Sequence, residues 1–212
     1  MSQSNQDSEA NIEQEIRDLE IQEPPFFSRK TLLDIKVNFP DFCRYYLELV
    51  MEKPEAESYP IYFLPSLAVI MGFFITVVAG FYKILPLFGS GFFRNKIGPL
   101  FLGGGIIGGF WLGLKTATLF YKGNTKNQDI SIITGIFFLP LIPGLWLAWF
   151  FSYGTWIAGI LIYFIAHTAS VTITYIAIPN ILLLKGIPRF AALTCAIISS
   201  VFGISLILRI LF

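Results

Sequence analysis

Carboxylates are nearly missing from the larger part of this chain of 212 residues. Residues 60–212 contain nine Lys and Arg but a single acid, Asp129, which we expect to lie in a loop. An intramembrane aspartyl protease needs two acids, a metalloprotease needs a histidine cluster with a glutamate, and proton-coupled transporters usually keep a buried Asp or Glu. None of these sets can be assembled here.

Histidine and cysteine are also scarce. The chain has one histidine, His167, and two cysteines, Cys43 and Cys195, which lie in different regions. Two such cysteines make neither a disulfide framework nor a metal-ligand spacing, and no G-x-S-x-G nucleophile elbow occurs. We therefore expect no metal, no cofactor and no catalytic residues, and the chain is predicted not to be an enzyme.

Charged residues make up 14% of the chain, whereas a soluble protein has about a quarter. Residues 1–59 hold 13 acidic and 6 basic residues, a net charge of −7, while residues 60–212 have a net charge of +8. The acidic head argues against a nucleic-acid-binding arm, and it lacks the basic start and apolar core of a secretory signal. We predict an acidic cytoplasmic head over 1–58 and a membrane domain over 59–212.

Long apolar runs dominate the second part, and 55% of the whole chain is hydrophobic. About 20 apolar residues at 1.5 Å each cross a hydrocarbon core roughly 30 Å thick. Trp146, Trp149, Tyr153 and Trp156 cluster in one short region, as amphipathic rings do at headgroup level. We predict an all-α polytopic bundle in the lipid bilayer, with five spans at about 60–82, 97–121, 130–151, 155–178 and 190–212.

The breaks between these spans carry polar or turn residues, at 94–96, 122–129, 152–155 and 179–189. Five spans place six basic residues on the side of the N-terminus and four on the opposite side. The positive-inside rule then predicts a cytoplasmic N-terminus. The membrane is either a bacterial inner membrane or a eukaryotic endomembrane, which this pattern does not distinguish.

Six glycines fall within residues 103–113, inside the second span. The predicted helix-packing face consists of Gly105, Gly109, Gly113 and Ala117. Gly104 and Gly108 form a parallel row. Small residues four apart let another helix approach closely, whereas a phosphate-binding loop would follow a strand, which is not expected here. The partner helix lies either in the same chain or in a homo-oligomer or hetero-oligomer.

Ionisable groups inside spans are candidates for function, because burying them in lipid is costly. Lys115 and Arg209 are expected to snorkel toward the interface. The third group, near mid-span, belongs to a polar stripe that consists of Tyr163, His167, Ser170 and Thr174. The stripe fits a polar cavity or a proton relay, and it fits interhelical hydrogen bonding equally well.

A proline-rich segment, PLIPG at 140–144, predicts a kink or a broken helix in the third span. Broken helices line the binding sites of many transporters. Prolines are also tolerated in membrane helices that have no such role, so the segment alone does not decide between these alternatives.

The head contains two predicted helices. Residues 11–22 form a short acidic amphipathic helix, and a second helix starts at Pro40. The apolar face of the second helix consists of Phe42, Tyr46, Leu49 and Val50. This helix lies on the bilayer surface or against the bundle, or it offers a docking face to a soluble protein partner.

The layout and several segments resemble the Yip-domain family (Ypt/Rab-interacting proteins). These segments are NFPDFCRYYLELV (38–50) with ESYPIYFLPSLAVIMGF (57–73), LPLIPGLWLAW (139–149) and LLKGIPRFAAL (183–193). A DLYGP-like signature is lacking before the first span, which implies a divergent or prokaryotic-type member. The resemblance implies a non-enzymatic membrane protein that organises membranes or partners, in membrane trafficking if the source is eukaryotic.

The preferred functional prediction is therefore a membrane scaffold or adaptor whose head recruits a soluble partner. The alternative is a small transporter or channel that uses the polar stripe and the proline break.

Overall fold

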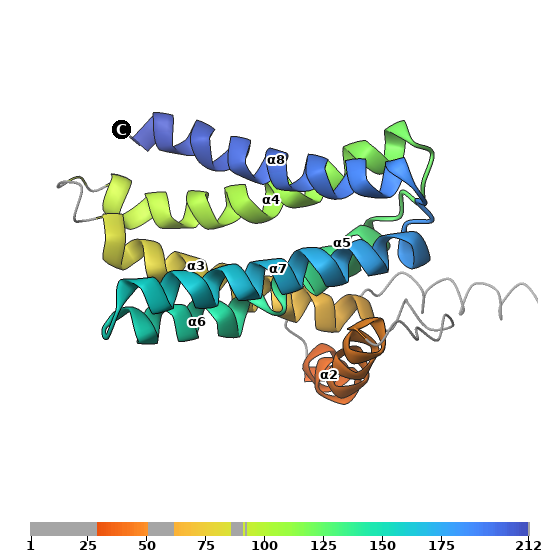
Figure 1. Cartoon of the computed structure of the whole chain (residues 1–212), viewed down its shortest axis with the longest axis horizontal. Coiled ribbons are helices and arrows are strands. Elements are labelled where there is room, and N and C mark those ends of the chain that lie inside the picture. Colours follow the sequence, from red (N-terminus) through yellow and green to blue (C-terminus); the bar gives the residue numbers. More distant parts are fainter. Residues whose placement is uncertain (1–28, 51–61, 86–90, 92, 212) are drawn as a thin grey trace, which may run out of the picture.

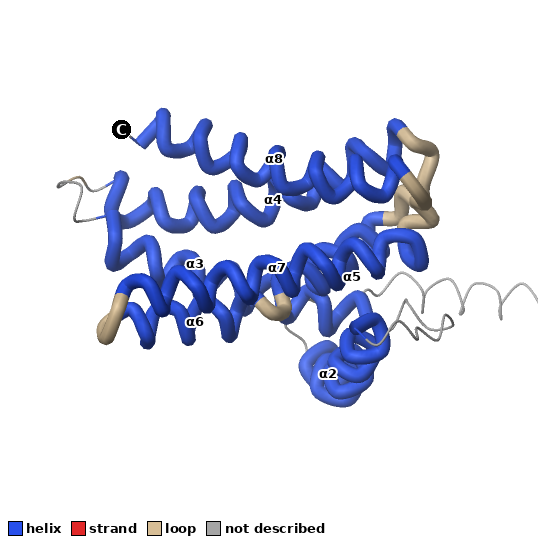
Figure 2. Tube along the Cα trace, in the orientation of Figure 1, coloured by secondary structure: helices blue, strands red, loops and turns tan. Residues whose placement is uncertain are grey.

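The computed structural model of the chain describes residues 29–50, 62–85, 91 and 93–211. The regular elements in these ranges are all helices, as predicted, and these ranges contain no strand (Figures 1 and 2). The predicted helix at 11–22 lies outside the described residues. In chain order the helices are α2 (Arg29–Val50), α3 (Phe63–Ile84), the π-helical turn η3 (Phe93–Ile97), α4 (Gly98–Phe120), α5 (Asn127–Phe138), α6 (Leu141–Ser152), α7 (Trp156–Ile181) and α8 (Ile187–Leu211).

Five of the helical segments are long and apolar enough to cross a bilayer. Each end lies within three residues of the predicted boundary. The segments run alongside one another, with their links gathered at the two ends of the bundle (Figure 1). These features make the chain a multi-pass integral membrane protein. The segments are Phe63–Ile84, Asn95–Phe120, Asn127–Ser152, Trp156–Ile181 and Ile187–Leu211.

The most extensive helix contact joins α4 and α8. A Cβ atom added at Gly109 would lie 2.5 Å from the Ser199 carbonyl oxygen, and one added at Gly113 would lie 2.6 Å from Ala196 Cα. Only glycine therefore permits this backbone approach. In this chain the glycine face packs against α8, whereas a Cβ at Gly108 would meet nothing within 4 Å.

The third span is the most enclosed of the five. Every residue of α5 from Asp129 to Phe138 is buried. Gly135 lets α3 approach closely, since an added Cβ would lie 2.6 Å from Ser66 Cβ. The span is broken at Leu139–Pro140, where α5 ends and α6 begins. A proline nitrogen has no hydrogen to donate to the carbonyl four residues earlier, and this explains the predicted break.

Of the expected breaks, the one at 94–96 is helical, and the one at 179–189 is shorter than expected, since only residues 182–186 separate α7 from α8. Residues 94–96 belong to η3, which leads directly into α4, and α7 continues through Pro179 to Ile181. Pro179 cannot donate a hydrogen bond to the Tyr175 carbonyl oxygen. Arg189 Nε donates to that oxygen instead, so the helix continues past the proline without leaving a carbonyl unpaired.

Helix α2 begins at Arg29, so the predicted start at Pro40 is wrong, and Pro40 lies inside the helix. Ile35, Phe39 and Phe42 follow at helical spacing, which extends the apolar face toward the N-terminus. Packing of this face offsets the cost of the internal proline. Figure 1 shows α2 end-on while the spans run across the view, so α2 lies across the spans.

Candidate functional site

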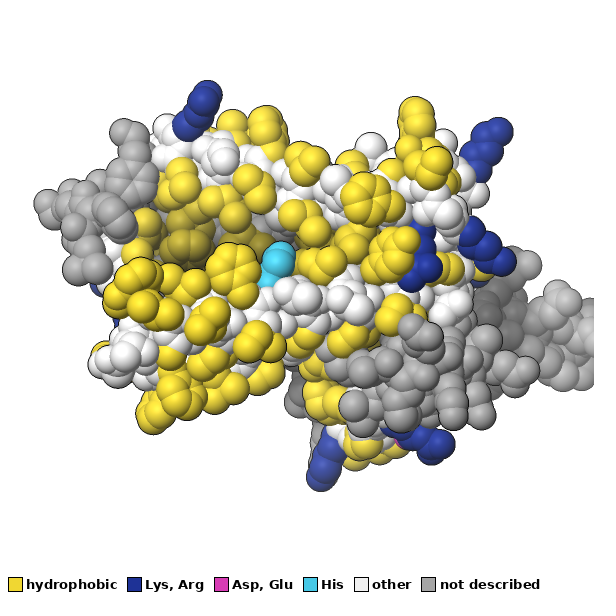
Figure 3. All heavy atoms as spheres, viewed as in Figure 1, with side chains coloured by type: hydrophobic (Ala, Val, Ile, Leu, Met, Phe, Trp, Pro, Cys, Tyr) yellow, Lys and Arg dark blue, Asp and Glu magenta, His cyan; other side chains and the backbone are white. Residues whose placement is uncertain are grey.

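A cavity of about 950 Å³ lies between the α4–α8 pair and α3, α6 and α7. Its volume is in the range of small-molecule pockets, about 300–1,000 Å³. Figure 3 shows a recess next to the histidine side chain on the face that carries α7 and α8. Because α7 and α8 contact each other much less than α4 and α8 do, the recess opens sideways, where lipid surrounds the bundle.

Phenylalanine rings close the deep end of the cavity. The rings of Phe73 and Phe138 stack with centroids 4.0 Å apart, and those of Phe110 and Phe137 stack at 4.2 Å. The four residues come from α3, α4 and α5, and all are buried. Stacked aromatic rings bury much apolar area at low conformational cost, so this end of the cavity is a rigid apolar floor.

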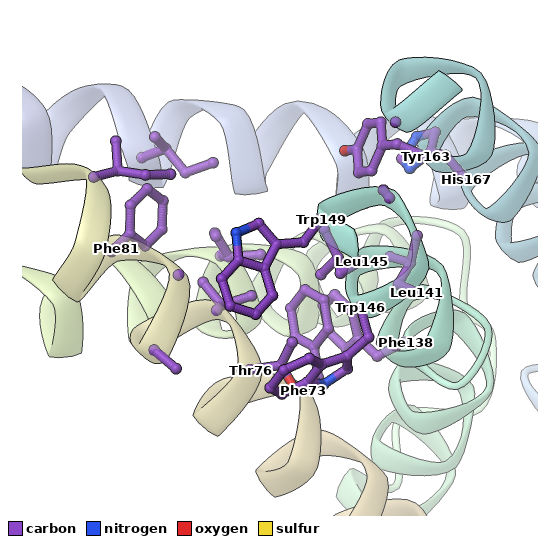
Figure 4. A pocket seen from close by; sticks show the side chains of 18 of the residues that line it. Phe73, Thr76, Phe81, Phe138, Leu141, Leu145, Trp146, Trp149, Tyr163 and His167 are labelled. Carbon is purple, nitrogen blue, oxygen red and sulfur yellow. The ribbon is translucent and has the colours of Figure 1, made fainter. Parts of the chain in front are cut away.

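Lys83 lies at the opposite end of the cavity, near the α3 C-terminus. Its ammonium group lies 3.8 Å from the centroid of the Trp149 ring. It is the one Lys or Arg among the described residues that line the cavity. Trp149 projects from α6 into the cavity, with Phe81 on one side and Phe73 and Phe138 on the other (Figure 4). A cation above an indole ring at headgroup level is a typical interfacial arrangement.

The predicted polar stripe divides between the cavity and the core. Tyr163 and His167 line the cavity, and their rings stack with centroids 5.8 Å apart (Figure 4). Ser170 and Thr174 are fully buried beyond it. Within the described part of the chain, His167 Nδ1 and both hydroxyl groups have no hydrogen-bond partner. The interhelical hydrogen bonds that were one explanation of the stripe are not observed at these three atoms.

The remaining ionisable residues of the spans occupy structural positions near helix ends. Lys115 Nζ donates to the Thr125 carbonyl oxygen at 2.5 Å and to Asn127 Oδ1 at 2.8 Å, so it reaches the link between α4 and α5. Arg209 lies in the last turn of α8. These positions agree with the expected snorkelling.

Asp129 was expected in a loop, but it lies buried in the first turn of α5. Asn124 Nδ2 donates to Asp129 Oδ2 at 2.5 Å and to the Ile181 carbonyl oxygen at 3.1 Å. A carboxylate near a helix N-terminus is stabilised by the helix dipole, and Asn124 ties it to the end of α7. Asn124 therefore links the N-terminal turn of α5 to the C-terminal end of α7.

The predicted docking face on α2 is partly used within the chain. Phe42 is 0% exposed and Tyr45 is 1% exposed. Their rings lie 6.0 and 4.9 Å from that of Tyr62, just before α3. Phe42 is therefore not available to a partner, and the side chains of Tyr46, Leu49 and Val50 lie outside the described residues.

Sequence reasoning offered a polar cavity at the stripe as one alternative, but it missed most of the cavity wall. The four floor phenylalanines and Lys83 carry no motif, since aromatic and basic residues are common in apolar spans and at their ends. Two local signals were present. Tyr163 and His167 of the polar stripe line the cavity, and the helix that follows the break at Pro140 supplies Trp149. The described part of the chain contains no group of three or more His, Cys, Asp or Glu arranged to hold a metal ion.

No protein-family model matches the chain, and searches of curated proteins and of solved structures also find no match. Its class therefore rests on the fold, which is that of a multi-pass helical membrane protein with a laterally open apolar cavity.

Proposed function

We propose that this protein is a non-enzymatic integral membrane scaffold or adaptor with a cytoplasmic N-terminus. The observation that carries the proposal is the fixed position of α2. Phe42 and Tyr45 hold the helix across the bundle, so the start of α2 at Arg29 has a defined place on the membrane domain. A partner bound to such a head is held at a constant position relative to the bilayer.

The distribution of charge supports this orientation. The links between α4 and α5 and between α7 and α8 lie at the end of the bundle where α3 begins (Figure 1). The first link carries Lys122 and Lys126, the second carries Lys185, and Arg189 follows in the first turn of α8. Basic residues in short links favour the cytoplasmic side. The acidic head then faces the cytoplasm, where soluble partners are available.

The proposal extends to a divergent or prokaryotic-type member of the Yip-domain family. Its support is the layout, in which an amphipathic helix precedes five closely spaced spans, together with the sequence segments named above. A shared layout supports a common architecture, and the function is tested by experiments on the protein itself.

The test is affinity purification in mild detergent of the intact chain and of a chain that lacks residues 1–28. The shortened chain keeps α2, so the packing of Phe42 and Tyr45 is preserved. We expect a stoichiometric soluble partner with the intact chain and its loss from the shortened one. If both chains purify without a partner, the adaptor proposal is wrong.

Transport is the second candidate, and the unpartnered His167 in a large cavity favours it. Proteoliposomes with a pH-sensitive dye would report proton flux. A transporter with a histidine relay should lose flux in His167→Leu and keep it in Thr168→Leu, since Thr168 is exposed on the same helix. A scaffold should show no flux in any of the three chains.

A further inference from the structure

The geometry points to a lipid-binding site. We infer that the cavity between the α4–α8 pair and α3, α6 and α7 holds one acyl chain of an anionic phospholipid, with the headgroup at Lys83. This inference is independent of the proposed scaffold function. It rests on the depth of the cavity, its lining, its lateral opening and the position of its one cation.

The depth of the cavity matches one leaflet. Along α3 it extends from Phe73 at the floor to Lys83 at the mouth. Ten residues of helix at 1.5 Å each correspond to about 15 Å, which is half of a hydrocarbon core roughly 30 Å thick. A chain that lies parallel to the spans therefore reaches the floor while its headgroup stays at the interface.

The lining is mainly hydrocarbon, and His167 Nδ1 is an unpartnered polar atom in it. Val77, Leu145 and Ile204 come from three different helices around the cavity, and all of them line it. Two of the polar residues in the wall already have partners, since Thr76 donates to the Gly72 carbonyl oxygen at 2.9 Å and Ser200 donates to that of Ile106 at 2.9 Å. A water-filled cavity would need two to four free polar partners for each water.

The lateral opening gives a lipid direct access. Ile160 and Tyr163 line the α7 side of the recess, and Val201 and Ile204 line the α8 side. The recess lies on the face of the bundle that Figure 3 shows as mainly hydrophobic around it. A lipid chain in the surrounding leaflet can enter sideways without passing through water.

Electrostatics select the headgroup. Lys83 has Trp149 beneath it and no carboxylate partner within the described part of the chain. Lys96 lies nearby, since Tyr82 donates to its carbonyl oxygen at 2.7 Å, and the single acid of residues 60–212, Asp129, is held at the opposite end of the bundle. An ammonium group at the mouth of the cavity with no acidic neighbour favours a lipid whose phosphate is not balanced by a positive charge in the same headgroup.

The chain offers a matched pair of glycines for blocking the cavity. Gly80 lines it and an added Cβ there meets nothing within 4 Å, so Gly80→Leu extends into open cavity space. Gly104 has the same open surroundings but does not line the cavity. Gly104→Leu therefore controls for the change of residue type in an apolar helix.

The experiment is native mass spectrometry of the full chain in mild detergent, with phosphatidylglycerol and phosphatidylcholine that carry the same acyl chains. We expect one retained phosphatidylglycerol per intact chain. Retention should fall about tenfold or more in Gly80→Leu and stay unchanged in Gly104→Leu. Equal retention in the two variants, or no retained lipid on the intact chain, would overturn the site.

A second pair of variants tests the headgroup in chains whose cavity is intact, and so does not depend on how well Gly80→Leu folds. Lys83→Gln should lower the preference for phosphatidylglycerol over phosphatidylcholine about fivefold, because one interfacial cation is lost. Lys185→Gln removes an exposed cation from the link at the opposite end of the bundle, does not alter the cavity wall and should leave the preference unchanged. Equal effects of the two variants would mean that general surface charge attracts the lipid, and would overturn the assignment to Lys83.

Discussion

Two adjacent glycines of α4 have opposite surroundings, and this gives a sharp test of the α4–α8 contact. At Gly109 an added Cβ would lie 2.5 Å from the Ser199 carbonyl oxygen and 2.8 Å from Ser200 Cα, whereas at Gly108 it meets nothing within 4 Å. We expect Gly109→Leu to lower the free energy of unfolding by about 3 kcal/mol, because backbone atoms must move apart. Thermal unfolding in detergent measures this.

Gly108→Leu is the matched control and should change the free energy of unfolding by less than about 1 kcal/mol. If both variants unfold at the same temperature, the glycine face does not hold α4 against α8.

Cys43 on α2 gives a prediction that depends on pH. Burial raises the pKa of its thiol above the ordinary value of 9.0, because desolvation disfavours the thiolate. The thiolate is the form that reacts with maleimides, so a raised pKa lowers the reaction rate near neutral pH. In a Cys195→Ala chain we expect slower labelling of Cys43 when folded than when unfolded in SDS, and a midpoint of the rate at higher pH in the folded chain.

The upward direction of the shift in the Cys43 thiol pKa is specific to burial. A cationic neighbour would lower the thiol pKa and shift the midpoint to lower pH. A folded-state midpoint at or below that of the unfolded chain would therefore contradict the described position of Cys43.

Individual residues were predictable from sequence where their role depends on local spacing. Gly105, Gly109 and Gly113 repeat every four residues, so a shared helix face follows from helical geometry alone. The environment of Asp129 was not predictable, because it depends on Asn124 and on the carbonyl group of Ile181, which is distant in the sequence. Pro179 likewise predicts a helix break from sequence alone. The helix continues because Arg189, which is distant in the sequence, donates to the Tyr175 carbonyl oxygen.

Among the helices, α2 provides the clearest test of how an element is held. Among the described side chains of α2, Phe42 and Tyr45 are buried, while Val37 is 65% exposed. We expect Phe42→Ala to remove about 3–5 kcal/mol of packing between α2 and the bundle. Hydrogen exchange over residues 29–50 should accelerate strongly in this variant, while exchange in the spans stays slow.

Val37→Ala is the control on α2. It should leave the hydrogen-exchange rates as they are in the unaltered chain, because the exposed Val37 side chain makes few packing contacts. Unchanged exchange in Phe42→Ala would show that the contact with Tyr62 does not anchor the helix.

The five spans were predictable because an apolar run long enough to cross a bilayer has few other stable arrangements. Their boundaries agree with the sequence to within three residues. The start of α2 was not, since proline is favoured in the first turn of a helix and disfavoured inside one, so Pro40 indicated a helix start. Whether the helix begins at Arg29 or at Pro40 depends on whether the apolar residues before Pro40 pack against the bundle, and this is a property of the tertiary structure.

The cavity depends on the arrangement of all the spans, which is why its apolar wall could not be predicted from any one part of the sequence. It exists because α8 packs closely on α4 through glycine and diverges from α7. Sequence patterns report which face of a helix is apolar, but membrane spans are apolar on nearly every face. Which faces meet protein and which meet lipid is therefore decided by packing.

The orientation of the whole bundle can be tested with two links at its opposite ends. Lys185 lies exposed in the link between α7 and α8, and Tyr153, 76% exposed, lies between α6 and α7 (Figure 1). In a chain with Cys43→Ala and Cys195→Ala, we introduce Lys185→Cys or Tyr153→Cys and add a membrane-impermeant maleimide. The proposed orientation predicts that Tyr153→Cys is labelled on intact cells, or from the lumenal side of an endomembrane, and that Lys185→Cys is labelled only from the cytoplasmic side.

The reverse pattern would invert the bundle and place the acidic head outside the cytoplasm, where it could not recruit a cytosolic partner. Labelling of both sites from the same side would contradict the five spans, because α7 would then not cross the bilayer between them. The predicted outcome would also place the Lys83 end of the cavity in the leaflet opposite the cytoplasm, which fixes the leaflet from which an anionic lipid would have to enter.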